Sequence, residues 1–88
     1  MSLRIIETKS ATKSLADLPE RIQDKYHTQK KRFQTDRRDP RLHLKKAVRF
    51  CGSVLASLTR AYRALFYYHT TDTAIIFAIG HRKDIYDK

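Results

Sequence analysis

The chain has 88 residues, which is enough for one compact domain over residues 1–88 and too few for two separate hydrophobic cores. Nineteen Lys and Arg residues against nine Asp and Glu residues give a formal charge of +10, so we expect an anionic partner. A hydrophobic content of 41% without any run of ~18 apolar residues excludes a disordered basic tail and a membrane span, and predicts a folded, soluble protein.

The first residues lack the pattern of a secretory signal, and the single Cys51 cannot form an internal disulfide. We therefore expect a cytoplasmic protein. No spacing of His or Cys residues indicates a metal site, and no cofactor is expected.

The first half of the chain predicts one strand and two helices. Residues 3–7 are apolar and β-branched enough for an opening strand, and Ser10 can cap a short helix over residues 11–16. Asp17 can cap a second, longer helix with Pro19 in its first turn, where a missing N–H group costs nothing.

The second helix carries a narrow apolar stripe that can pack on a sheet. The stripe consists of Leu18, Ile22, Tyr26 and Phe33. The basic residues between these positions are expected to stay in water. Pro40 should end the helix after it has frayed through residues 36–39.

The second half of the chain predicts the sheet, because nineteen of residues 50–79 are apolar. A basic loop, residues 41–46, comes first, and residues 51–53 are expected to form a hairpin turn. The predicted strands are residues 47–50, 54–58, 62–68 and 73–79. The last two are apolar on both alternating faces, which is typical of central strands buried on both sides. Four sequential antiparallel strands after two helices indicate an α+β fold in two layers.

Most of the excess charge lies in residues 21–49, which hold eleven basic and three acidic side chains. This density favours a phosphate-binding surface over a merely solvated face. The candidate RNA-binding residues are Lys30, Lys31, Arg32, Arg37, Arg38, Lys45 and Lys46. The aromatic residues that alternate along a predicted strand are interpreted as core, not as a base-stacking platform. They are Tyr62, Phe66, Tyr67 and Tyr68.

Two short motifs carry a resemblance to a known family. Tyr62-Arg63 opens one predicted strand, and Gly80-His81-Arg82-Lys83-Asp84-Ile85-Tyr86 follows the most hydrophobic one. With the order of the elements, these motifs resemble the RelE/ParE superfamily of bacterial toxins from toxin–antitoxin systems. The resemblance implies an N-terminal strand and a helical hairpin packed on a twisted antiparallel sheet of four to five strands.

The resemblance to RelE-like members also implies an activity. Such a toxin is a ribosome-dependent endoribonuclease that cleaves translated messenger RNA without metal, by attack of a ribose 2′-hydroxyl on the adjacent phosphate. By position, Arg63 is similar to the strand arginine that contacts this phosphate, and Arg82 to the arginine that supports it. His81 is similar to a late histidine that serves some relatives as general base, and Tyr86 to a tyrosine that stacks on a base or assists proton transfer.

The chain departs from the RelE-like pattern on the strand before Tyr62-Arg63. Many RelE-like nucleases place a Lys or Arg there that faces the cleft, whereas Leu55 and Ser57 are not basic. The candidates to supply this charge are Lys45, Lys46 and His43 in the preceding loop.

Alternatives stay open at this point. A ParE-like toxin would inhibit DNA gyrase without catalysis, and a basic RNA-binding protein would have no enzymatic activity. Arg63 could instead pair with an acidic residue across the sheet, and His81 could bond to a backbone carbonyl at a strand end. The leading hypothesis implies the ribosome, messenger RNA and an acidic antitoxin as partners, and no membrane partner.

Overall fold

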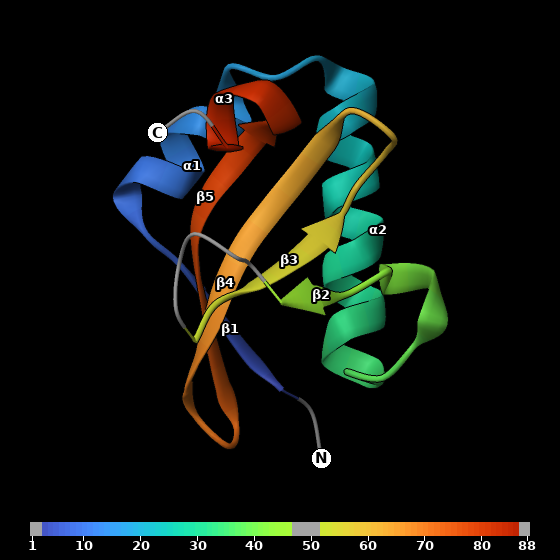
Figure 1. Ribbon diagram of the computed structural model, residues 1–88, viewed down its shortest axis with the longest axis vertical. Helices are drawn as coiled ribbons and strands as arrows, with labels where there is room; N and C mark the ends of the chain where they lie inside the picture. Colours follow the sequence, from blue (N-terminus) through green and yellow to red (C-terminus); the bar gives the residue numbers. More distant parts are fainter. Residues whose placement is uncertain (1–2, 47–51, 87–88) are drawn as a thin grey trace.

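The computed structural model describes residues 3–46 and 52–86, and only the backbone of Tyr86. A layer of helices packs on one sheet, which confirms the α+β class (Figure 1). The elements are β1 (Arg4–Glu7), α1 (Lys9–Ala16), α2 (Glu20–Thr35), the 3₁₀ turn η1 (Pro40–Leu42), β2 (Lys45–Lys46), β3 (Val54–Ser57), β4 (Tyr62–Thr70), β5 (Thr73–His81) and α3 (Arg82–Tyr86). No helix in this described part is long and apolar enough to cross a bilayer.

The sheet has five strands in the order β1-β5-β4-β3-β2 and is mixed. The pairs β3-β4 and β4-β5 are antiparallel, as predicted, and the pair β2-β3, whose first strand lies in the segment predicted to be a loop, is antiparallel too. The sequence predicted antiparallel strands throughout, but β1 lies parallel to β5, with Arg4 opposite Thr73 and Glu7 opposite Ile76. The backbone N–H of Arg4 also donates to the carbonyl of Asp72 at 2.8 Å. The first strand of the chain is therefore joined to the last.

Both predicted helices are present, but their caps differ from those predicted. Thr8, not Ser10, caps α1, because its hydroxyl accepts a hydrogen bond from the N–H of Ala11 at 3.1 Å. Asp17 ends α1 instead of starting α2, and Pro19 is itself the N-cap of α2, without a side-chain cap. The two helices are thus connected by residues 17–19 alone.

The apolar stripe of α2 packs on the sheet as predicted. Ile22, Tyr26 and Phe33 are buried, and Leu18 is partly buried beside them. A polar residue, Gln29, is buried on the same stripe. The helix ends at Thr35, a few residues before Pro40, also as predicted.

The segment after α2 is more ordered than the basic loop predicted from the sequence. Residues 40–42 form η1, and residues 45–46 form the short strand β2. The reason is that Leu42 is only 1% exposed and anchors the segment in the core. The predicted strand at residues 47–50 and Cys51 of the predicted turn lie outside the described residues. Gly52 follows with a φ of 79°, in the left-handed region that favours glycine.

The core has two parts, one on each face of the sheet. The larger part lies between the sheet and helices α1 and α2, where Tyr26 and Phe66 are the largest fully buried side chains. The smaller part lies on the other face, where Ile85 of α3 covers Leu55 and Leu65.

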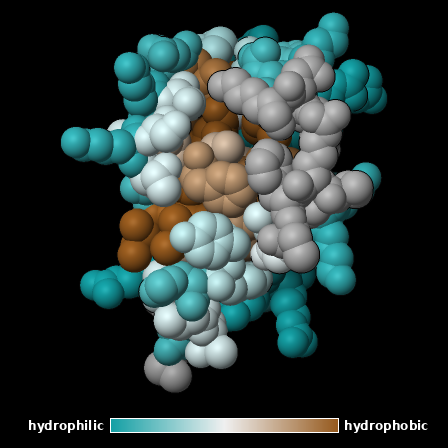
Figure 2. Space-filling model, turned by 60° about the vertical axis from the view of Figure 1, so that its left-hand side comes forward, coloured by the Kyte–Doolittle hydropathy of each residue, from teal (hydrophilic) through white to brown (hydrophobic). Residues whose placement is uncertain are grey.

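Beyond α3, no helix of the described part covers this second face of the sheet. Ile6, Ile75 and Tyr67 lie side by side on β1, β5 and β4, and Ile6 is 43% exposed. Figure 2 shows apolar side chains gathered in the middle of one face, among hydrophilic ones. The prediction that Tyr67 and Tyr68 belong to the core is wrong, because the last four residues of β4 are exposed.

Candidate functional site

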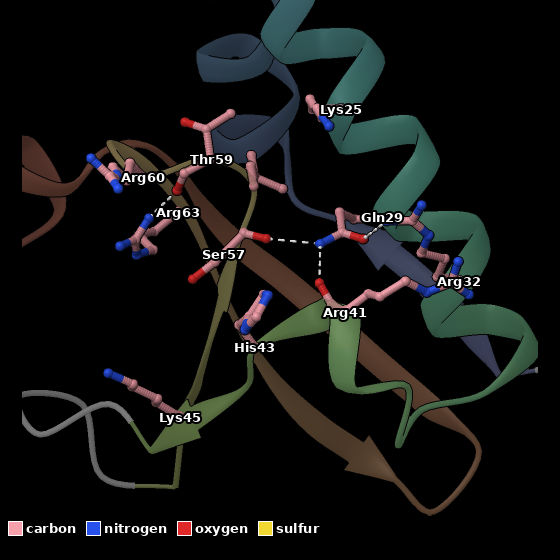
Figure 3. A pocket seen from close by; sticks show the side chains of 11 residues that line it. Lys25, Gln29, Arg32, Arg41, His43, Lys45, Ser57, Thr59, Arg60 and Arg63 are labelled. Atoms are coloured by element: carbon pink, nitrogen blue, oxygen red, sulfur yellow. Dashed lines mark hydrogen bonds between the residues drawn. The ribbon is translucent and has the colours of Figure 1, made fainter.

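A cavity lies between α2, η1, β2 and the start of β4, and we call it the basic cavity (Figure 3). Its volume is about 550 Å³. It is lined by Lys25, Gln29, Arg32, Arg41, His43, Lys45, Ser57, Leu58, Thr59, Arg60 and Arg63. Six of these residues are Lys or Arg and none is Asp or Glu. Such a concentration of one charge in a hollow attracts phosphate groups.

The buried Gln29 holds together three segments around the basic cavity. Its Nε2 donates to the carbonyl oxygens of Arg41, at 2.8 Å, and Ser57, at 3.0 Å. Its Oε1 accepts a hydrogen bond from Nη1 of Arg32 at 3.0 Å. Because the amide uses donors and acceptor at once, these bonds fix α2, η1 and β3 relative to one another.

The 3₁₀ turn is capped by Asp39, whose Oδ1 accepts from the backbone N–H of Arg41 at 2.9 Å. The same carboxylate pairs with the guanidinium of Arg41, with Nη2 and Oδ2 2.7 Å apart. These hydrogen bonds from Arg41 lower the pKa of Asp39 to about 2. The charge of Arg41 is therefore balanced. Among the described residues, no carboxylate pairs with the remaining cations of the cavity, Lys25, Arg32, Lys45, Arg60 and Arg63.

Arg63 lies on β4 between Ser57 of β3 and Gly80 of β5. Its Nη1 donates to the carbonyl oxygens of Thr59 and, at 3.1 Å, of Tyr62. The alternative in which Arg63 pairs with an acid across the sheet is not found among the residues described. The other N–H groups of the guanidinium make no hydrogen bond there, so they can meet an anion in the cavity.

His81 lines a different cavity, of about 630 Å³, together with Tyr62 and Asp84. It lies opposite Tyr62 in the sheet register, whereas Arg63 is one residue further along β4. Because side chains alternate along a strand, those of Arg63 and His81 point to opposite faces. The Nδ1 of His81 accepts the backbone N–H of Lys83 at 3.2 Å, and its ring packs edge-on against Tyr62.

Arg82 and Tyr86 belong to α3. The backbone N–H of Arg82 donates to the carbonyl of Ala61 at 2.6 Å, which brings the start of α3 beside the start of β4. The side chain of Arg82 is exposed and does not line the basic cavity. Tyr86 lies in the last turn of α3, and its side chain is outside the described part.

The predicted RNA-binding residues are spread over several surfaces. Arg32 and Lys45 line the basic cavity. The guanidinium of Arg37 lies 5.4 Å from the ring centre of Tyr68 and donates to the carbonyl of Thr71 at 2.7 Å. The exposed members that do not line the cavity are Lys31, Arg38 and Lys46.

The seventh member, Lys30, takes part in a network between α2 and β1. Its Nζ lies 3.1 Å from Oε1 of Glu7, and the hydroxyl of Tyr26 donates to Oε2 at 2.5 Å. Burial alone would raise the pKa of Glu7, but the hydrogen bonds from Tyr26 and Lys30 outweigh it and lower that pKa. Burial, with the hydrogen bond to Glu7, raises the pKa of Tyr26. Lys30 is therefore engaged within the fold.

Sequence reasoning missed Lys25, Arg41, Arg60 and Gln29 as residues of the cavity. The signal for Gln29 was its polar side chain in line with the apolar stripe of α2. His43 and Lys45, considered only as replacements for a missing strand cation, line the cavity together with Arg63. In the described ranges, no group of three His, Cys, Asp or Glu residues could hold a metal ion.

No protein-family model matches this sequence, and no curated protein matches it. Solved structures do match. The RelB–RelE antitoxin–toxin complex from Methanococcus jannaschii has a chain 23% identical, with a TM-score of 0.76 over 93% of this chain and 95% of that chain. The RelBE2 complex from Mycobacterium tuberculosis gives 25% identity and a TM-score of 0.65, over 93% of this chain and 100% of that chain. The DinJ–YafQ complex from E. coli gives 9% identity and a TM-score of 0.79, over 98% and 99%. The chain therefore has the fold of the RelE-like toxins.

Proposed function

We propose that this protein is the toxin of a type II toxin–antitoxin system and that it cleaves messenger RNA on the ribosome. The observation that carries the proposal is the basic cavity, in which Arg63 meets five other Lys or Arg residues and no Asp or Glu. An RNA strand presents one negative phosphate per nucleotide, so a hollow of this charge favours its backbone. The RelE-like fold is the second support.

The chemistry that fits this cavity is metal-free transesterification. A ribose 2′-oxygen attacks the adjacent phosphorus, the bond from phosphorus to the 5′-oxygen breaks, and a cyclic phosphate and a 5′-hydroxyl result. The free N–H groups of Arg63 bind the phosphate oxygens, on which negative charge increases in the transition state. The resemblance to RelE-like toxins adds Arg82 as a second cation, which would have to approach the substrate from outside the basic cavity, and Tyr86 as a stacking surface. Positioning of the substrate is left to the ribosome, since the domain is small.

The partner that restrains the toxin is proposed to be an acidic antitoxin. The net charge of +10 favours a negatively charged segment by long-range attraction. The apolar row of Ile6, Tyr67 and Ile75, on the face of the sheet that no described helix covers beyond α3, gives such a segment a surface to bury. The solved structures with this fold include toxins in complex with antitoxins, RelB and DinJ.

The test is a reconstituted translation reaction with one defined messenger RNA. The expected result is cleavage of the translated message, with 5′-hydroxyl ends, by the wild-type protein. Arg63→Gln and Arg82→Ala should each slow cleavage by roughly 10² to 10³, the scale of losing one transition-state donor. Lys13→Ala is the matched control, because it removes an exposed cation of α1 that neither lines the basic cavity nor belongs to the candidate RNA-binding residues.

Other outcomes would contradict the proposal. Gyrase-dependent DNA breaks in cells whose messages stay intact would establish a gyrase inhibitor. RNA that is bound but never cut would establish a binding protein without enzymatic activity.

A further inference from the structure

His43, the C-cap of η1, has a positive φ, which is uncommon for residues other than glycine although histidine is among those found there more often. Its φ of 49° and ψ of 54° lie in the left-handed region, and it is the one non-glycine residue with positive φ in the part of the chain described. A Cβ atom makes this region unfavourable, so the surrounding structure has to hold the residue there. Strained positions of this kind are concentrated at functional sites.

Several contacts hold the turn that carries His43. The side chain of Leu42, the preceding residue, is almost fully buried. The backbone N–H of His43 donates to the carbonyl of Pro40 at 3.2 Å. Gln29 binds the carbonyl of Arg41 from the other side. None of these contacts involves the imidazole itself, which leaves the ring at the cavity.

The imidazole of His43 is exposed, lines the basic cavity, and makes no hydrogen bond or ring contact among the described residues (Figure 3). Around it the cavity offers cations, hydroxyls, an amide and a leucine, but no carboxylate. Imidazole is a common general base in enzymes, since it can accept a proton on a ring nitrogen. Both ring nitrogens of His43 are therefore available to a ligand in the cavity.

His81 is in the opposite situation. Its Nδ1 is already occupied by the N–H of Lys83, its ring packs on Tyr62, and it lines another cavity than Arg63. Of these two histidines, His43 is the one that shares a cavity with the phosphate-binding guanidinium.

We propose that His43 is the general base of the site, an inference that rests on the proposed function. A ring nitrogen of His43 takes the proton of the ribose 2′-hydroxyl as the 2′-oxygen bonds to phosphorus. The bond between phosphorus and the 5′-oxygen breaks, and the leaving oxygen takes a proton from water. The imidazolium then releases its proton to water, which restores the enzyme. Arg63 holds the phosphate throughout.

The experiment measures single-turnover cleavage in the same translation reaction for His43→Gly, His43→Asn and His81→Gln. Gly and Asn both tolerate the left-handed conformation, so the turn is kept, and circular dichroism with thermal unfolding verifies the fold. Both His43 variants should cleave roughly 10² to 10⁴ more slowly than wild type, the usual contribution of a general base. Imidazole added to the buffer should restore part of the rate of His43→Gly, which leaves space for it, but not of His43→Asn. His81→Gln should keep the wild-type rate.

The outcomes separate the two proposals. If the wild type cleaves and a folded His43→Gly cleaves equally fast, or is slow and gains nothing from imidazole, His43 is not the base while the proposed function stands. If His81→Gln is the slow variant, the base is His81. If the wild type leaves translated RNA intact, the proposed function fails and the role of His43 fails with it.

Discussion

Replacing Tyr26 with Phe removes one oxygen from the interior and tests the network that ties α2 to β1. The Tyr26 side chain is 2% exposed, and its hydroxyl donates to Oε2 of Glu7 at 2.5 Å, while Lys30 binds Oε1. Phe fills the same space as Tyr except for the hydroxyl. The change therefore reports on the hydrogen bond and not on packing.

The expected loss follows from the charge and the exposure of Glu7. A hydrogen bond to a charged group contributes about 1.5–3 kcal/mol to the free energy of unfolding. The Glu7 side chain is 24% exposed, so water replaces part of the lost bond. We expect Tyr26→Phe to lower the free energy of unfolding by about 1–2 kcal/mol at pH 7, or roughly 4–8 °C in Tm for each kcal/mol.

The loss should depend on pH with a definite sign. The pKa of Glu7 is lowered in the folded protein from its ordinary value of 4.5. A lowered pKa means that the charged carboxylate stabilises the fold above pH 4.5 and that this stability is lost as the pH falls through the folded pKa. The difference between wild type and Tyr26→Phe should therefore shrink at acidic pH.

Urea unfolding at pH 7 and at pH 3 measures both effects. Tyr62→Phe is the control, since the hydroxyl of this half-buried tyrosine makes no hydrogen bond within residues 3–46 and 52–86. Its stability should change by less than about 0.5 kcal/mol. A Tyr26→Phe protein as stable as wild type at pH 7, or one that loses the same amount at both pH values, would refute the reasoning.

Two further predictions concern packing and charge. Phe33 is 5% exposed, and its ring centre lies 4.7 Å from that of Phe66. Phe33→Ala should therefore lower the free energy of unfolding, measured in urea, by about 3–5 kcal/mol. A loss below about 1 kcal/mol would contradict the place of Phe33 in the core. In an NMR titration the pKa of the Asp39 carboxyl should be about 2 in the wild type and should move toward the ordinary value of 3.8 in Arg41→Gln. A wild-type pKa near 3.8 would show that Asp39 and Arg41 do not pair in solution.

The elements that sequence predicted well are those specified by neighbouring residues. The stripe of α2 is a periodic pattern and the strands β4 and β5 are apolar runs, and each segment carries its pattern by itself. Gln29 was missed because a stripe analysis counts apolar positions, although a polar residue within the stripe is the mark of a buried hydrogen-bonded group.

The features of the fold that the sequence did not predict depend on contacts between residues far apart in the chain. Nothing in residues 3–7 states that β1 pairs with β5, or that it does so in parallel. The exposure of Tyr67 and Tyr68 follows from where the helices stop covering the sheet, since a strand with two apolar faces predicts burial only where both layers exist.

Only part of the candidate site could be predicted, because the rest also depends on contacts between residues far apart in the chain. Arg63 was found from its motif, and the basic character of residues 21–49 from their composition. The grouping of Arg63 with His43 and Lys45 required η1 and β2, which bring a segment some twenty residues upstream to the start of β4. Alternation along β4 also separates Arg63 from His81, although their motifs suggested a shared site.

The parallel pairing of β1 with β5 also sets the order in which the protein can fold during synthesis. Helices α1 and α2 leave the ribosome early, but β5 is made near the end of synthesis. Ala74 and Ile76 of β5 belong to the same core cluster as Ala11 of α1 and Ile22 of α2. Contacts of such sequence separation close late and slowly. Until residues 73–76 of β5 have emerged, β1 has no strand to pair with, and the helices have no complete sheet to pack on. A nascent chain should therefore stay incompletely folded until β5 has emerged, and a chain interrupted before β5 should be a substrate for proteolysis.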